Sequence, residues 1–325
     1  MLQLQTGLVL GTQAQEHFIT LPLVGKEEES VNLPLVINVV AKYWGEDIAP
    51  KAASGSASIQ KGTILIDGIE LAERHGFVSY VYKGSMKDLK KRIDQGIPPI
   101  VIMPGIQGIV QHATVVSGYD TEERRILTYV PEPDTVGAIP EAKFEKDWSQ
   151  DDMTTIVILP ADMKDLLKNE ALIFKTSNRL CFEAERHRQH GNMEGAFEKA
   201  RSATSTDPGN AQAWCLLAGL CNEIGSEETI SLYQKAIELN PHYYLAYRGM
   251  GNYYLKRHDF SLAESYYSKA IEINSTRFGP IYKNRAVARM QLGSNQSAKE
   301  DLQRYLDQTP TAEDRKSIED AMLQL

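Results

Sequence analysis

The sequence predicts an α+β first half followed by an all-α second half. The first half opens with an apolar stretch of helical character at residues 31–45 and continues as short apolar runs that alternate like strands. From about residue 175 the pattern is helical to the end of the chain and repeats at nearly constant spacing. A chain of 325 residues is long enough for about two domains. We therefore divide it into residues 1–162 and 163–325, and because no Pro- or Gly-rich linker separates them, we expect the two halves to pack on each other.

The composition argues for a cytoplasmic globular protein. Hydrophobic residues make up 42% and charged residues 24%, and the formal net charge of −8 argues against a nucleic-acid or anionic-membrane surface. No Lys or Arg precedes Lys26, so the basic region of a secretory signal is missing. No apolar run approaches the roughly 20 residues that a membrane-spanning helix needs. We therefore expect no membrane insertion and no nucleic-acid partner.

The three cysteines, Cys181, Cys215 and Cys221, all lie in the second half. An odd number without CxxC spacing predicts neither a disulfide framework nor a zinc site and favours buried apolar roles. His187 and His190 have a spacing compatible with a metal ion, but no third ligand is in view, which favours exposed polar positions. We expect no metal and no cofactor.

The first half contains the elements of a sheet with helices. The predicted helices are 31–45, 62–76 and 85–96. The predicted strands are 17–24, 77–84, 98–103, 112–120, 126–130 and 154–160. Ser85 is typical of a helix N-cap, and Gly76 and Gly96 are typical helix stops. A buried helix followed by an antiparallel sheet is an α+β arrangement.

The helix at 31–45 is the element around which this half is organised. It is apolar on nearly every side, which places it inside a domain rather than on a surface. Asn32 lies at its start and Pro34 just inside it. The open end of a helix offers unpaired N–H groups and a positive dipole, which suits a nucleophile or an anion. The residue at this position is Asn, not Cys or Ser.

Turn residues set the period of the second half. Pro208, Pro241, Ser275 and Pro310 are 33, 34 and 35 residues apart. Small and aromatic residues recur in register between these turns, and this pattern resembles the tetratricopeptide repeat. The resemblance implies pairs of closely packed helices and a groove that holds a peptide or helix of a partner. The predicted repeats are about 177–208, 211–241, 244–275 and 279–310, with a capping helix at 311–325.

The third and fourth repeats resemble those tetratricopeptide proteins that clamp a C-terminal carboxylate. Arg248, Asn252 and Asn284 match the positions of that clamp, and we add Lys283 to the predicted partner-binding set. The positions expected to supply a further Lys and Arg hold Asp314 and Ile318 instead, with Arg315 and Lys316 only nearby. The alternative is that Asn252 and Asn284 hydrogen-bond between neighbouring helices while Arg248 is a solvated groove residue.

The first half resembles the papain-like cysteine peptidases that process bacteriocin leaders. The family opens with Cys-Gly-Pro at the start of an apolar helix that ends in Tyr-Trp-Gly; Pro34 and the Tyr43–Gly45 sequence match, and Asn32 stands at the cysteine position. His112, at the start of HATVVSGYD, falls on the catalytic histidine. The phrases GTILIDGIELAERHG, QGIPPIVIM and FEKDW match in the same order. The resemblance covers about residues 15–160 and implies a papain-like α+β fold.

The same resemblance implies a degraded catalytic centre. Asn32 has no ionisable or nucleophilic atom, so it cannot replace the thiolate that cysteine chemistry needs. The orienting Asp-Pro of the family appears as Val130 followed by proline, or as Glu132 if the register slips by two, and its oxyanion Gln is absent from KEEES. Ser30 is an alternative nucleophile, although a helix-entry role is favoured. His112 is either a relic base that still hydrogen-bonds a ligand or Asn32, or a partly buried structural histidine.

These features predict a non-catalytic adaptor that binds a protein or peptide. The repeat groove is the expected binding site, with the old substrate cleft as a second candidate. One alternative is a hydrolase or transferase that uses His112, with an acidic partner such as Glu132, and a water molecule. Another is a scaffold subunit of a larger complex.

Overall fold

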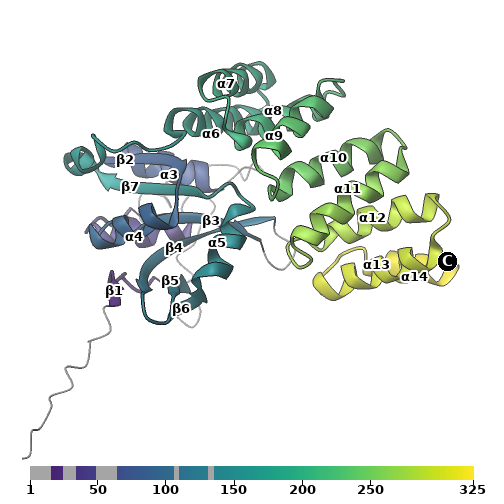
Figure 1. The fold of residues 1–325 in the computed structure, drawn as a ribbon, viewed down its shortest axis with the longest axis horizontal. Helices are drawn as coiled ribbons and strands as arrows, with labels where there is room; N and C mark the ends of the chain where they lie inside the picture. Colours follow the sequence, from purple (N-terminus) through teal and green to yellow (C-terminus); the bar gives the residue numbers. More distant parts are fainter. Residues whose placement is uncertain (1–15, 25–33, 49–63, 106–109, 131–134) are drawn as a thin grey trace, which may run out of the picture.

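The computed structural model describes residues 16–24, 34–48, 64–105, 110–130 and 135–325. Within these ranges strands and helices are mixed up to residue 167, and from residue 175 onward the regular elements are helices (Figure 1). The expected order of an α+β part followed by an all-α part is confirmed. The predicted division at 162/163 falls inside the 3₁₀ helix η2 (Ala161–Leu167), which follows the last strand.

The strands of the first half form one antiparallel sheet. Their order is β2-β7-β3-β4-β5-β6, and β1 also pairs with β4, so that β4 has three neighbours. The bounds are β1 Glu16–Phe18, β2 Phe77–Lys83, β3 Ile100–Pro104, β4 Gln111–Asp120, β5 Arg125–Val130, β6 Thr135–Pro140 and β7 Thr154–Pro160. The central strands carry apolar side chains on both faces, because both faces of the sheet are covered by helices.

Two pairs of helices cover the two faces. Helices α1 (Leu35–Tyr43) and α3 (Ile64–Arg74) share one apolar cluster with the sheet. Helices α4 (Met86–Asp94) and α5 (Glu141–Ser149) share another, on side chains that alternate with the first set along β3 and β4. The N-cap of α4 is Ser85, as predicted, whose hydroxyl accepts a hydrogen bond from the backbone of Asp88 at 3.1 Å.

Helix α1 is the buried centre of this half, as predicted, but it is shorter than the sequence suggested. Every residue from Leu35 to Ala41 is buried. The helix begins after Pro34 rather than around it, because Pro34 has the extended ψ of 143° and serves as the N-cap. Asn32 lies outside the described residues. At the other end, the Tyr43 hydroxyl donates to the Gly96 carbonyl at 2.8 Å and the Trp44 indole donates to the Ile158 carbonyl at 3.0 Å, which ties the helix to the sheet.

The contact of α1 with α3 depends on a missing side chain. A Cβ atom at Gly68 of α3 would lie 2.4 Å from Cδ of Pro34. Any larger residue at position 68 would push α3 away from the start of α1. Gly68, the middle glycine of GTILIDGIELAERHG, therefore lies where α3 closely approaches the start of α1.

Three expectations for the first half need correction. The strand predicted at 17–24 is limited to Glu16–Phe18, since Pro22 has no N–H to continue a ladder. Strand β6 was not predicted, because its sequence TVGAIP contains Gly and Pro and reads as a turn. Helix α5 was not predicted, and its sequence was used only as the phrase FEKDW, although Phe144 and Trp148 are four residues apart and both fully buried on one helical face.

The second half is a stack of helix pairs, and four such pairs follow one another along the described residues 175–308. The bounds are α6 Lys175–Gln189 with α7 Met193–Thr206, α8 Ala211–Glu223 with α9 Thr229–Leu239, α10 Tyr244–Lys256 with α11 Phe260–Ile273, and α12 Pro280–Gln291 with α13 Asn295–Gln308. The predicted capping helix is α14 (Arg315–Gln324). The ribbon shows these pairs stacking side by side along the second half (Figure 1). In the parts of the chain that the structure describes, no helix is both long enough and apolar enough to cross a membrane.

The two halves are joined through the loop that follows α5. Asp151 in this loop forms an ion pair of 2.5 Å with Arg277, and both side chains are almost completely buried. Its neighbour Asp152 pairs with Lys83 of β2 at 2.6 Å and accepts a hydrogen bond from Asn240 at 3.1 Å. Because Asn240 and Arg277 come from turns between repeats, the sheet half is fixed against the edge of the helical stack.

Candidate functional site

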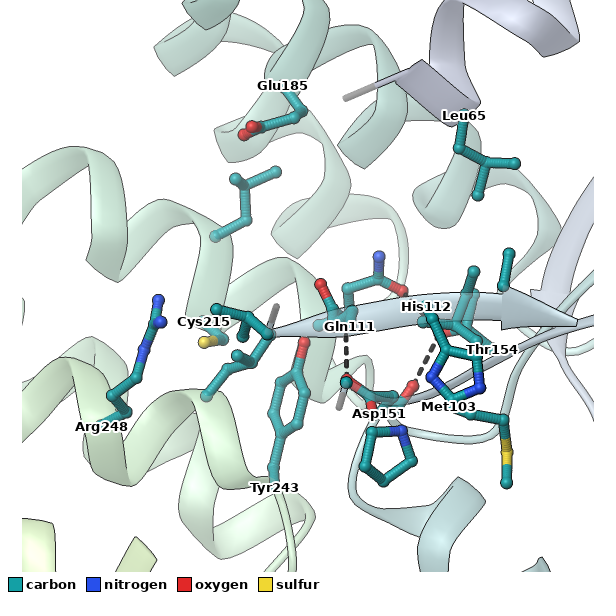
Figure 2. A pocket seen from close by; sticks show the side chains of 18 of the residues that line it. Leu65, Met103, Gln111, His112, Asp151, Thr154, Glu185, Cys215, Tyr243 and Arg248 are labelled. Atoms are coloured by element: carbon teal, nitrogen blue, oxygen red, sulfur yellow. Dashed lines mark hydrogen bonds between the residues drawn. The ribbon is translucent and has the colours of Figure 1, made fainter. Parts of the chain in front are cut away.

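A cavity of about 1610 Å³ lies between the sheet half and the helices α6, α8 and α10. On the sheet side it is bordered by the start of α1, the first turn of α3 and the ends of β3 and β4. On the helical side it is bordered by the first helix of each of the first three repeats. Figure 2 shows the strands with His112 and Met103 on one side and the helices with Cys215 and Arg248 on the other. The site therefore belongs to both halves of the chain.

His112 is the part of the predicted catalytic centre that the structure brings to this cavity. It stands near the start of β4, opposite Met103 of β3. It lines the same cavity as Pro34, the residue that precedes α1. Burial lowers the pKa of the His112 imidazole; a backbone hydrogen bond to Pro104 acts against this, and the charge of Arg277 lowers the pKa further. The ring is therefore neutral at pH 7. Its Nδ1 is buried and has no hydrogen-bond partner in the described part of the chain.

The other predicted catalytic positions cannot be placed around His112. Asn32, Glu132 and Ser30 lie outside the described residues. Val130 is described only as the last residue of β5, with no account of its side chain. Among the described residues, the charged group that acts on His112 is Arg277, which is a cation and not the carboxylate that would orient a catalytic imidazole.

A hydrogen-bonded group of polar side chains borders the cavity next to His112. Gln111 donates a hydrogen bond from Nε2 to Oδ1 of Asp151 at 2.6 Å, and Arg277 donates to the same oxygen. Burial raises the pKa of Asp151, while the charge of Arg277 lowers it. We take the carboxyl to be ionised, since a guanidinium 2.5 Å away and a second donor both stabilise the charged form. This group closes one end of the cavity and belongs to the junction between the halves.

Two cysteines reach the cavity from the helical half. Cys181 of α6 and Cys215 of α8 occupy equivalent positions on neighbouring helices, and both line the cavity. Burial raises the pKa of the Cys215 thiol to about 12, although the charge of Arg248 acts against it. Burial likewise raises the pKa of Cys181. Both side chains are protonated at neutral pH and are not the thiolates that a cysteine nucleophile requires.

Arg248 and Asn252, predicted to bind a partner, both line the cavity on α10. The Arg248 guanidinium lies over the ring of Phe278, 5.1 Å from its centroid, and its Nε is buried without an acceptor. The amide oxygen of Asn252 accepts a hydrogen bond of 2.8 Å from the Tyr267 hydroxyl and one of 3.4 Å from Asn284. The hydrogen bond between the two asparagines matches the alternative that the sequence left open for them.

Lys283 and Asn284 are not among the described residues that line the cavity. Lys283 forms an ion pair of 2.8 Å with Asp314, and its ammonium lies 5.0 Å from the ring centroid of Tyr305. Asp314 occupies a position at which the carboxylate clamp would have a basic residue, and its own carboxylate neutralises the charge of Lys283. The structure brings Arg248 and Asn252 together with His112 in one cavity and leaves Lys283 outside it.

Most charged side chains around the cavity are paired within the protein. Arg188 pairs with Glu223 at 2.9 Å and also with Glu185, and Lys143 pairs with Asp147. For Arg248 and Lys256 of α10, no ion pair is found in the part of the chain that the structure describes. The charge left without a partner is therefore positive and lies on α10.

The two histidines whose spacing is compatible with a metal ion make local contacts. Nδ1 of His187 lies 3.1 Å from Nδ2 of Asn192, and Nδ1 of His190 lies 2.8 Å from the Arg186 carbonyl. Across the described ranges, no group of three or more His, Cys, Asp or Glu side chains is arranged to hold a metal ion.

Several residues of the site were not predicted from the sequence. Gln111 is adjacent to His112, but nothing in its surroundings pointed to a contact with Asp151. Cys181 and Cys215 were predicted to be buried, which is correct, yet their position on the cavity wall depends on how the two halves pack. The available signal was that the two cysteines occupy equivalent positions in the first and second repeats. This places both on the same face of the first helix of each pair.

No protein-family model matches the chain, and no curated protein matches it. Among solved structures, the chain is similar to a thermophilic TPR protein of Thermus thermophilus, with 18% identity over 50% of this chain and 88% of that one, and a TM-score of 0.40. It is also similar to PilW, described as a widely conserved type IV pilus biogenesis factor, with 23% identity over 50% and 75% of the two chains and a TM-score of 0.42. MamA is 18% identical over 46% and 87%, with a TM-score of 0.39.

Proposed function

We propose that this protein is a non-catalytic adaptor that binds a peptide or protein segment in the cavity between its two halves. The observation that carries this proposal is that His112 of the sheet half and Arg248 and Asn252 of the helical half line one cavity. His112 was predicted from the resemblance to a peptidase, and Arg248 and Asn252 from the resemblance to a carboxylate clamp. All three line the same cavity. A stack of helix pairs presents the faces of its first helices as an extended binding surface, which is the common use of such repeats.

We further propose that the sheet half is a papain-like domain that has lost its catalytic cysteine. Support comes from the buried helix α1, the antiparallel sheet and the position of His112 near the start of a strand that borders the same cavity as Pro34. The residue two positions before Pro34 is Asn32, which has no nucleophilic atom. Binding without cleavage is the activity that such a domain retains.

The alternative of a hydrolase or transferase that uses His112 receives less support. A general base needs a carboxylate or a similar group to orient and stabilise its protonated form. The charge that acts on His112 is that of Arg277, which disfavours protonation of the imidazole. A base that resists protonation in this way is poorly suited to take a proton from water.

Selection from a library of random dodecapeptides displayed on their encoding messenger RNA tests the binding function. We expect the wild-type protein to enrich a family of peptides. Gly219→Trp should abolish this enrichment, because Gly219 lines the cavity and a Cβ there meets nothing closer than the Tyr233 hydroxyl at 3.8 Å, so the indole extends into the cavity. Ser265→Trp, on the exposed side of α11, is the matched control and should keep the enrichment. Absence of enriched peptides, or enrichment that survives Gly219→Trp, would contradict the proposal.

Catalysis is tested separately with fluorogenic peptide substrates and an activity-based cysteine probe. We expect neither cleavage nor labelling above the level of denatured protein. Cleavage that disappears in His112→Ala would show that the cavity is an active site and would replace the adaptor by an enzyme.

A further inference from the structure

Arg248 differs from every other buried or half-buried arginine of this chain. Each of the others has a carboxylate within 3.5 Å, in the pairs Arg92–Asp88, Arg179–Glu73, Arg186–Glu70, Arg188–Glu223, Arg277–Asp151, Arg285–Asp301, Arg289–Glu264 and Arg315–Glu319. For Arg248, no carboxylate is found at ion-pair distance in the described part of the chain. Within the described residues, the other arginines that leave the surface have a counter-ion, including Arg188, which also lines the cavity, and Arg248 is the exception.

The surroundings of Arg248 are neutral. One face of its guanidinium lies on Phe278, and its charge acts on the thiol of Cys215 and the hydroxyls of Tyr233 and Tyr244. Burial keeps all three of these groups protonated. A half-buried cation without a counter-ion lowers the stability of the folded protein, because the hydration that it loses is replaced only in part by the ring of Phe278. Residues that lower stability in this way are typical of binding sites.

The site is not the multi-residue clamp suggested by the sequence. In such a clamp Lys283 and Asn284 would act on the same ligand as Arg248. Lys283 is instead paired with Asp314, and the Asn252 amide oxygen already accepts from Tyr267. Arg248 therefore acts without Lys283, and the groups opposite it across the cavity belong to the sheet half (Figure 2).

The cavity continues past Arg248 in both directions along the stack. Its lining extends to Cys181 and Phe182 of α6 on one side, and to Asn274 and Thr276 of the turn before α12 on the other. A ligand that ended at Arg248 would leave one of these parts empty. At about 1610 Å³ the cavity also exceeds the volume of about 300–1,000 Å³ that is usual for small-molecule sites. An extended peptide that passes Arg248 fits this shape better than a small anion or a chain terminus.

We infer that Arg248 binds the side-chain carboxylate of an Asp or Glu within an extended peptide that runs through the cavity. This inference rests on the proposed function and adds the chemistry of the ligand. The guanidinium offers two N–H groups in a plane that matches a carboxylate, and the low polarity of Phe278, Cys215 and Tyr233 strengthens the pair. The apolar wall of α6 and α8, with Leu216 and Leu220, accommodates apolar residues on one side of the acidic one.

The test compares peptides selected by the wild-type protein with those selected by Arg248→Met and Arg248→Glu. We expect the wild type to enrich peptides with an acidic residue at one fixed internal position, and Arg248→Met to bind these peptides at least tenfold more weakly. Arg248→Glu should change the preference at that position to Lys or Arg. Arg304→Met, which removes an exposed cation of α13, is the charge-matched control and should bind as the wild type does.

Synthetic variants of one selected peptide separate a side chain from a chain end. Replacement of its acidic residue by the amide should cause the same tenfold loss, whereas amidation of its C-terminus should cause none. Loss on C-terminal amidation, or an equal loss in Lys283→Met, would overturn the inference in favour of a terminal-carboxylate clamp. Peptides without a fixed acidic position, or unchanged binding in Arg248→Met, would overturn it while leaving the adaptor function standing. Failure to enrich any peptide would overturn both.

Thermal melting of the variants tests whether weaker peptide binding by Arg248→Met results from a less stable fold. Because Arg248 has no carboxylate partner in the described protein, and Met can keep the apolar contact with Phe278, Arg248→Met should melt at or above the temperature of the wild type. Arg285→Met, which removes a paired arginine, should melt several degrees lower. A comparable loss in Arg248→Met would show that Arg248 has a structural role and would overturn its assignment to ligand binding.

Discussion

His112 illustrates how burial and a neighbouring charge together determine the protonation of a single side chain. Burial lowers the pKa of its imidazole, and Arg277 contributes in the same direction. The folded protein therefore resists protonation of His112, whereas the unfolded chain takes up the proton at the usual value of about 6.5. Stability contributed by the neutral ring is present above that pH and is lost as the pH falls below it.

This linkage predicts a pH effect on stability. Urea unfolding of the wild type should show a midpoint that decreases between pH 7 and pH 5, and His112→Gln should show a smaller decrease because Gln does not titrate. An NMR titration of the ring should give a midpoint for His112 below the usual value of about 6.5. Equal decreases in the two proteins would show that other groups control this pH range.

The cavity thiols give a second prediction at this scale. The pKa of Cys215 is raised from 9.0 to about 12, so its thiolate fraction at neutral pH is lower by on the order of a thousandfold. Iodoacetamide at pH 7.5 should therefore label Cys215 in the native protein at least about a hundredfold more slowly than in urea-unfolded protein. Peptide mass spectrometry over time measures both rates. Rapid labelling of native Cys215 would reopen the possibility of thiol chemistry in the cavity.

At the scale of elements, the packing of α10 on α11 depends on Gly251. A Cβ at this position would lie 2.5 Å from ring atoms of Tyr267, which is itself fully buried. Gly251→Ala should lower the free energy of unfolding by about 1–3 kcal/mol, the usual effect of overpacking a core. Gly219→Ala is the matched control, since a Cβ there meets only the Tyr233 hydroxyl at 3.8 Å, and the helix gains up to about 1 kcal/mol of propensity. Urea unfolding measures both, and a neutral Gly251→Ala would contradict the close approach.

Helices and strands whose apolar or small residues recur at a regular spacing could be predicted from the sequence. Elements that form mainly through contacts with neighbouring segments could not. The helix pairs of the second half follow from recurring small residues such as Gly251 and Ala263, whose role is local to one pair. Strand β6 has no such pattern, because it is an edge strand whose ladder with β5 is formed by backbone groups. Helix α1 was predicted from its apolar sequence, but its start was misplaced by the extended backbone of Pro34.

At the scale of the whole molecule, the cavity exists because the two halves are fixed in one arrangement. The residues that make the contacts between the halves have no distinguishing pattern in the sequence. Asn240, Asn274 and Arg277 were visible only as turn residues that mark the period. In the structure they contact the loop after α5, more than 80 residues away in the chain. The sequence predicted that the halves pack on each other, yet it held no signal for the partners, because a contact between distant segments leaves no periodic pattern.

The ion pair of Arg277 with Asp151 should therefore control both stability and the site. Arg277→Met leaves Asp151 buried without its counter-ion and should lower the free energy of unfolding by about 3–5 kcal/mol. The double variant Arg277→Met with Asp151→Asn removes the uncompensated charge as well, so its loss should be smaller than that of Arg277→Met alone.

Urea unfolding followed by tryptophan fluorescence, which reports on Trp148 in the sheet half and Trp214 in the helical half, measures these losses. Arg304→Met, which replaces an exposed arginine of α13, should change stability by less than about 0.5 kcal/mol. If the ion pair also holds the cavity open in its present shape, peptides selected by the wild type should bind the double variant more weakly, even where it remains folded. A single variant as stable as the wild type would show that the two halves are held together by their other contacts and that the buried pair contributes little.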